Sequence, residues 1–218
     1  SPSPTVGAAD AQPEGGRPAP KILIPFYSRT GTVQRLAEAV AEGARAEGAE
    51  VRLRRARELV SPEIVASVPG WKEAADAMNT RYEAPTADDA LWADAIVFGT
   101  PTRFGSVASE LKAYIDSLGA VWAQGKLVGK VGSAFAGSSQ QHGGNESTII
   151  SLYNPMAHLG LVIVPTGYGD GVMFAGAGSP YGASVVSGNP PAGPSEAELA
   201  VGRFQGKRVA QIARKLAS

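Results

Sequence analysis

The sequence predicts a doubly wound α/β domain, in which helices cover both faces of a parallel sheet. Short apolar runs of the kind found in buried strands alternate with longer segments whose apolar residues recur every three or four positions. The 218 residues, 44% of them hydrophobic, suffice for one domain with a full core. With no Cys and only two His, the chain has no disulfide scaffold, no thiol nucleophile and no Cys/His metal site, so we expect no bound metal.

The first half of the chain predicts two strands joined by a helix. Residues 22–27 read ILIPFY and suit a buried parallel strand. From Val33 the apolar residues recur every three or four positions, which predicts a helix with one apolar face that ends near Gly48. Apolar and polar residues alternate over 51–53, which predicts a second strand. Residues 56–90 predict a connection with limited helix, because Ser-Pro, Pro-Gly and Pro breakers interrupt them.

The second half repeats the alternation. Further strands are expected at 95–99, 131–135 and 161–164, with helices at 107–118, at 146–158 and from Ser195, where a capping residue is followed by acidic residues. A long excursion rich in Gly, Pro and Ser covers 165–194. Five such strand–helix units predict the flavodoxin-like order 2-1-3-4-5 in a five-stranded parallel sheet.

Residues 1–20 are expected to form a disordered tail before a single domain at 21–218, since this tail contains five Pro, three Gly and one large aliphatic residue. No apolar run approaches the roughly 20 residues that span a bilayer. Without a signal pattern or any Cys, we expect a cytoplasmic protein with no membrane span. Twenty basic residues balance 20 acidic ones, so no nucleic-acid partner is expected.

Three loops follow the carboxyl ends of strands, where open parallel sheets bind ligands. The first, 28–32, offers three hydroxyls, a Gly and a helix start, which favours a phosphate; the alternative is that one hydroxyl only caps the helix. The second, 100–105, combines a turn stiffened by Pro with Arg103 and Phe104, and can bind the polar edge of a flat heterocycle while the aromatic ring covers its face. The alternative is a plain turn with Phe104 in the core. The third, 137–144, is Gly-rich and polar and is expected to wrap the same ligand.

The absence of other motifs narrows the ligand. The sequence has no G-x-G-x-x-G fingerprint, no P-loop and no G-x-S-x-G elbow, which argues against a dinucleotide fold, NTP hydrolysis and an α/β-hydrolase. A phosphate cradle beside two loops suited to a planar ring describes a flavin mononucleotide (FMN) site.

Five segments carry a resemblance to a known family. They are GTPTRFG (99–105), SRTGTV (28–33), LGAVWAQGKLVGK (118–130), AHLGLVIVP (157–165) and SPYGAS (179–184). From Lys21 to its end the chain resembles the WrbA-type NAD(P)H:quinone oxidoreductases, flavodoxin-like flavoproteins once called tryptophan-repressor-binding proteins.

The resemblance implies a role for each matching residue. The FMN phosphate would be held by Ser28, Arg29, Thr30, Gly31, Thr32 and Val33. The isoalloxazine and ribityl chain would contact Pro101, Thr102, Arg103, Phe104 and Gly105, and the ring edge would be closed over by Gly137, Ser138, Ser139, Gln140, Gly143 and Gly144. His158 would lie near the flavin and assist proton delivery to the quinone, with a helix C-terminal dipole contact as the alternative.

The substrate pocket would include Trp122, Phe104 and Thr30. In the family the Trp lies across a subunit boundary of a homotetramer; the alternative for Trp122 is ordinary core burial. The family carries Tyr where this chain has Thr30, a position associated with the nicotinamide. Trp71 and Trp92 are interpreted as core residues.

The resulting hypothesis is a two-electron quinone reduction in which NADH or NADPH passes a hydride to flavin N5, leaves, and is replaced by the quinone in a ping-pong cycle. One alternative is a flavodoxin-type single-electron carrier, although such carriers tend to be acidic and this chain has no net charge. The other is a non-catalytic module that binds a repressor.

Overall fold

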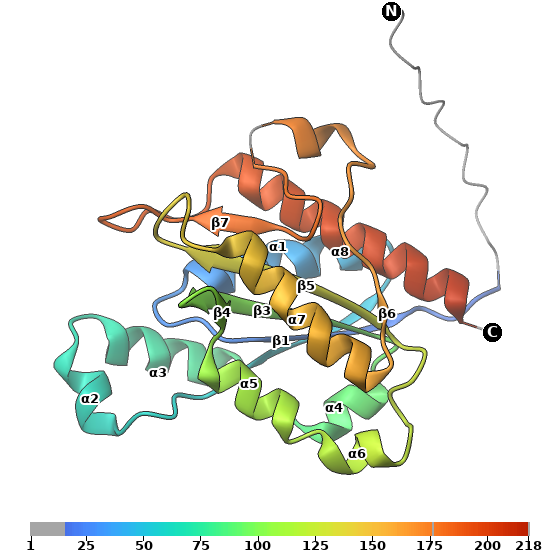
Figure 1. Ribbon diagram of the computed structural model, residues 1–218, viewed down its shortest axis with the longest axis horizontal. Helices are drawn as coiled ribbons and strands as arrows, with labels where there is room; N and C mark the ends of the chain where they lie inside the picture. The colour runs from blue at the N-terminus through green and yellow to red at the C-terminus, as the bar shows by residue number, and fades with distance from the viewer. Residues whose placement is uncertain (1–15, 176, 218) are drawn as a thin grey trace, which may run out of the picture.

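A parallel sheet separates two layers of helices in the computed structural model, which describes residues 16–175 and 177–217 (Figure 1). Its main path runs β2-β1-β3-β5-β6. The strands are β1 (Lys21–Phe26), β2 (Glu50–Arg55), β3 (Ala95–Arg103), β5 (Val131–Ser138) and β6 (Val162–Ile163). All neighbours on this path are parallel, as the predicted class requires, and the path matches the predicted order 2-1-3-4-5 only when β4 and β7 are left out of the count.

The sheet differs from the prediction in having seven strands instead of five. The short strand β4 (Ser106–Val107) folds back antiparallel on the end of β3. The strand β7 (Ser184–Val186), inside the segment expected to be an irregular excursion, pairs with the end of β5, whereas β6 pairs with its beginning. The fifth position of the sheet is therefore shared by two short strands, because the chain leaves after β6 and returns at β7.

Two helices, α1 (Thr32–Ala46) and α8 (Glu196–Leu216), lie side by side on one face of the sheet. Their apolar residues share one buried cluster with side chains of β1, such as Ile22 and Ile24. The opposite face is covered by α4 (Ala87–Trp92), α5 (Ser109–Asp116), α6 (Gly119–Ala123) and α7 (Asn145–Leu159), whose buried residues form a second cluster.

The segment 56–90 contains more helix than expected: α2 (Pro62–Ser67), α3 (Trp71–Arg81) and α4. Residues interpreted as breakers act here as start signals. The Ser61 hydroxyl caps α2, with Pro at the first helical turn, where its missing N–H costs nothing. Thr86 and Asp89 form a reciprocal capping box at α4.

The remaining helices match the sequence pattern closely. α7 begins and ends within one residue of the expected positions, and α8 begins directly after Ser195, which caps it as predicted. The expected helix over 107–118 is shorter, since Val107 belongs to β4 and α5 runs from Ser109 to Asp116, and α6 follows it. A short 3-10 helix, η1 (Gly171–Phe174), lies within the excursion. In the described residues, no helix combines the length and apolarity that a bilayer crossing requires.

Of the predicted tail at 1–20, residues 1–15 lie outside the described residues. The described chain from Gly16 to Pro20 leads into β1, and the carbonyl of Pro20 accepts a hydrogen bond from Glu50 N at 2.9 Å. Arg17 Nη1 donates to the carbonyl oxygen of Arg214 at 3.3 Å, so this segment passes the end of α8.

Candidate functional site

A cleft of about 720 Å³ opens where β1, β3 and β5 end. All three predicted loops contribute to its wall: Ser28, Arg29, Thr30, Thr32 and Val33 from the first, Pro101, Thr102, Arg103 and Phe104 from the second, and Gly137, Ser138, Ser139, Gln140 and Gly143 from the third. Ser187 and Pro191 also line the cleft. The sequence analysis missed these two, because only the pairing of β7 with β5 brings the excursion to this edge.

The first loop presents the start of α1 to the cleft. The helix begins after Gly31, whose φ of 116° lies in the left-handed region, and among the described residues no side chain caps it. The buried hydroxyl of Ser28 instead accepts a hydrogen bond from Gly31 N at 3.1 Å. The interpretation of these hydroxyls as simple helix caps is therefore wrong. Uncapped N–H groups at a helix N-terminus favour binding of an anion.

The second loop holds an aromatic ring out from the protein. Phe104 is the one non-glycine residue of the described chain with positive φ, at 51°, and its side chain is fully exposed. The alternative that Phe104 belongs to the core is therefore wrong. Thr100, which is buried, fixes the base of the loop by accepting from Ala108 N at 3.0 Å and donating to the carbonyl of Pro101 at 2.7 Å. A strained backbone that is held this firmly is typical of a functional loop.

The second and third loops are joined behind the cleft. Thr148, fully buried in α7, hydrogen-bonds to the hydroxyl of Thr102 at 2.8 Å, and that hydroxyl also accepts from Gly105 N at 3.2 Å. Gly144 has a φ of 95°, and a Cβ there would lie 3.2 Å from the Cα of Gly105. Gly105 and Gly144 therefore approach each other closely, and neither they nor Gly31 line the cleft.

The cleft is positively charged. Its described lining residues include two cations, Arg29 and Arg103, and no carboxylate. A phosphate with two negative charges would gain charge-assisted hydrogen bonds in such a site.

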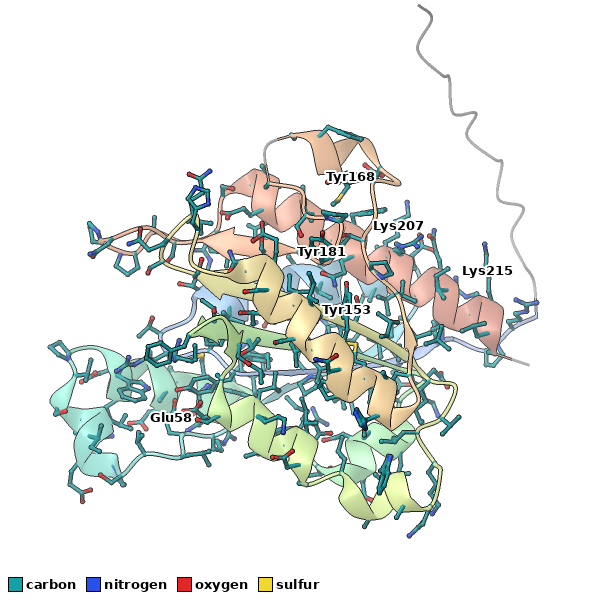
Figure 2. All side chains as sticks on the ribbon, in the orientation of Figure 1. Glu58, Tyr153, Tyr168, Tyr181, Lys207 and Lys215 are labelled. Atoms are coloured by element: carbon teal, nitrogen blue, oxygen red, sulfur yellow. The ribbon has the colours of Figure 1, made fainter. Side chains whose placement is uncertain are left out.

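A buried ion pair supports the first loop from below. Arg55, which has no exposed surface, donates from Nη2 to the carbonyl of Ser28 at 2.8 Å and to Glu58 Oε2 at 2.9 Å. Glu58 also accepts from Tyr27 Oη at 2.7 Å. Figure 2 shows Glu58 in the part of the molecule where α2 and α3 lie. The sequence analysis missed Arg55 and Glu58, since nothing distinguishes Arg55 from the other arginines at 52–57.

The same contacts set the ionisation of this cluster. Burial by itself would raise the pKa of Glu58, but hydrogen bonds from Arg55, Tyr27 and Trp71 and the charge of Arg55 bring that pKa below its usual value. Burial and the neighbouring Glu58 raise the pKa of Tyr27. Glu58 is therefore a carboxylate and Tyr27 a neutral phenol at neutral pH.

His158 and Trp122 lie apart from the cleft of their own chain. They line a separate cavity of about 390 Å³ between α5, α6 and the end of α7. Trp122 Nε1 donates to the carbonyl of His158 at 2.8 Å, and the side chain of Trp122 is 53% exposed, so ordinary core burial does not describe it. His158 occupies the last turn of α7, which agrees with the alternative of a contact with the helix dipole.

Comparisons with known proteins identify the family and the fold of the chain. Residues 27–170 match the family model of NADPH-dependent FMN reductase. The chain is 48% identical over 205 residues to an NAD(P)H dehydrogenase (quinone) from Syntrophobacter fumaroxidans, and 46% identical over 206 residues to one from Sinorhizobium fredii. Each alignment covers 90% of this chain and 98% of the relative.

A solved structure shows the same fold. The flavodoxin, WrbA-like protein from Agrobacterium tumefaciens matches with a TM-score of 0.63 and 25% identity, covering 90% of this chain and 99% of that one. The expected flavodoxin-like class is thereby confirmed. Since the family model spans more than half of the sequence and the relatives span nearly all of it, the chain belongs to the NADPH-dependent FMN reductase family.

Proposed function

We propose that the protein is an FMN-dependent NAD(P)H:quinone oxidoreductase. The observation that carries the proposal is the cleft, where an uncapped helix start and three hydroxyls stand beside an exposed aromatic ring. The names of the relatives, NAD(P)H dehydrogenase (quinone), and the family model for FMN reductases support the reaction class.

The residues present fit FMN. Residues 28–33 would bind the phosphate through hydroxyls, helix N–H groups and Arg29. Thr102, Arg103 and Phe104 would contact the ribityl chain and the isoalloxazine, and residues 137–143 would close over the ring edge. The volume of the cleft is in the range of pockets that hold cofactors of this size.

When bound, FMN would supply the two-electron chemistry that couples oxidation of NADH or NADPH to reduction of a quinone in a ping-pong cycle. The residues of the chain would bind the cofactor and orient it in the cleft. Hydrogen bonds of Thr100 fix the base of the 100–105 turn that carries Phe104, and the close approach of Gly144 to Gly105 keeps the second and third loops together. Thr30, an exposed residue of the cleft lining, would offer a hydroxyl at the position that the resemblance associates with the nicotinamide, where the family carries Tyr.

We further propose a homotetramer in which Trp122 and His158 reach the cleft of another copy, His158 delivering a proton to the quinone oxygen. The exposure of Trp122 and its separation from its own cleft support this arrangement. We expect light scattering to give a mass four times that of the 22.4 kDa chain. A monomeric mass with full activity would contradict it.

The function is tested by turnover. We expect the purified protein to oxidise NADH or NADPH with benzoquinone, under anaerobic conditions, only when FMN is present and faster than free FMN alone. Phe104→Ala should lower kcat/KM by about two- to tenfold, since an aromatic contact contributes roughly 0.5–1.5 kcal/mol. Phe174→Ala, which removes a similarly exposed ring on η1 outside the cleft, is the control. If the wild type does not oxidise NADH or NADPH in an FMN-dependent way, the proposal is wrong.

A further inference from the structure

An arginine on the first loop stacks on a tryptophan of the segment between β2 and β3. Arg29 follows Ser28 directly, is partly buried and lines the cleft, and its Cζ lies 3.8 Å from the ring centroid of Trp71. We propose that Trp71 is a positioning residue that fixes the charge of Arg29 at the phosphate end of the cleft and thereby sets the affinity for phosphorylated flavin. This inference rests on the proposed function.

The ring of Trp71 is itself held in place. Its side chain lies at the start of α3, is 5% exposed, and donates from Nε1 to Glu58 Oε2 at 3.1 Å. Glu58 is fixed in turn by its bidentate contact with Arg55. Because the indole is hydrogen-bonded at one edge and buried, its face stays directed at the guanidinium of Arg29.

The backbone of the loop depends on the same network. The carbonyl of Ser28 accepts from Arg55 Nη2, which is also bound to Glu58. Trp71 therefore holds the Arg29 side chain, and Arg55 holds the backbone immediately before it. An arginine restrained in this way loses less conformational freedom when it binds a phosphate than a freely moving one.

Charge assigns Arg29 to the phosphate. Of the two cations among the described lining residues, Arg103 is exposed on the second loop, where Nη1 donates to the carbonyl of Thr102 at 3.1 Å. Arg29 belongs to the loop that carries the α1 N-terminus, so it is the cation placed to add to the helix N–H groups. An aromatic face also leaves the edges of a guanidinium free to donate.

The chain offers a matched control pair. Arg52 stacks on Trp92 with Cζ 4.0 Å from the ring centroid, in the same kind of contact. This pair joins β2 to α4, and neither residue lines the cleft. Removing the Trp92 ring therefore removes an equivalent cation–π contact away from the phosphate end.

The test compares FMN with riboflavin, which has the same ring system and no phosphate. Both ligands are titrated by flavin fluorescence against the wild type, Trp71→Leu, Trp71→Phe and Trp92→Leu, at low and high salt. We expect Trp71→Leu to raise the Kd for FMN on the order of tenfold, with a smaller increase for Trp71→Phe, which keeps an aromatic face. The Kd for riboflavin should stay unchanged, and the salt dependence of FMN binding should become shallower.

The outcomes separate the two proposals. A wild type that does not bind FMN would end the proposed function and this inference with it. A wild type that binds FMN, with Trp71→Leu weakening FMN and riboflavin equally or weakening neither, would overturn only the role of Trp71. Because Trp71 packs in a small cluster with Val65 and Ala75, separate from the two main clusters, we expect the variant to fold, and a cooperative unfolding transition in urea checks this.

Discussion

Glu58→Gln is expected to lower the free energy of unfolding by about 3 kcal/mol, because it leaves the Arg55 guanidinium buried without its counter-charge. Arg55 has no exposed surface, and the side chain of Glu58 is 10% exposed. The loss should appear as a lower denaturation midpoint in urea with an unchanged slope. Asp116→Asn, which breaks the exposed pair with Lys112, is the control and should cost less than about 0.5 kcal/mol.

The pH dependence gives the same prediction a second check. The pKa of Glu58 is lowered in the folded state, so its stabilising effect is complete above the unfolded value of about 4.3 and is lost as the pH falls through the folded value. The difference in stability between wild type and Glu58→Gln should be constant near neutrality and shrink below about pH 4. An equal difference at pH 3 and pH 7 would show that the carboxylate charge is not what stabilises the fold.

Gly43→Ala is expected to destabilise the protein by about 3 kcal/mol, although the same change in an exposed helix interior usually stabilises by about 0.5–1 kcal/mol. A Cβ at Gly43 of α1 would lie 1.8 Å from the carbonyl oxygen of Arg203 in α8. Backbone atoms cannot rotate away, so the two helices must separate. The same helix begins at the wall of the cleft, which Thr32 and Val33 line.

Gly119→Ala in α6 is the control for this prediction. An added methyl there would meet no atom within 4 Å, and the residue does not have positive φ. Its stability should be unchanged or rise by up to about 1 kcal/mol. If both substitutions stabilise the protein in urea, the close contact between α1 and α8 is not as the structure describes it.

The sequence predicted most of the sheet and the walls of the cleft, because both follow from local signals. Apolar runs identify β1, β3 and β5, and the parallel arrangement brings the loops after them to one edge. The residue types within those loops, hydroxyls, a stiff turn and glycines, then indicate a phosphate and a flat ring. None of these steps needs information from distant parts of the chain.

The features that the sequence did not predict depend on contacts between distant residues. Trp71 is buried, as predicted, but its contact with Arg29 was not predicted, because it forms only where α3 lies against the first loop. β7 has no strong strand pattern and forms through pairing with β5. In the sequence Arg55 cannot be distinguished from a surface arginine, because its hydrogen bonds to Glu58 and to the Ser28 carbonyl form only in the folded chain. In each case tertiary contacts outweigh the local pattern.

A crystal structure of the protein grown with FMN tests the central claim most directly. We predict one FMN per chain, with its phosphate at the start of α1 beside Ser28 and Arg29 and its ring system against Phe104. Electron density for FMN at another surface, or a cleft without FMN in crystals that hold the cofactor elsewhere, would contradict the assignment of this cleft as the flavin site.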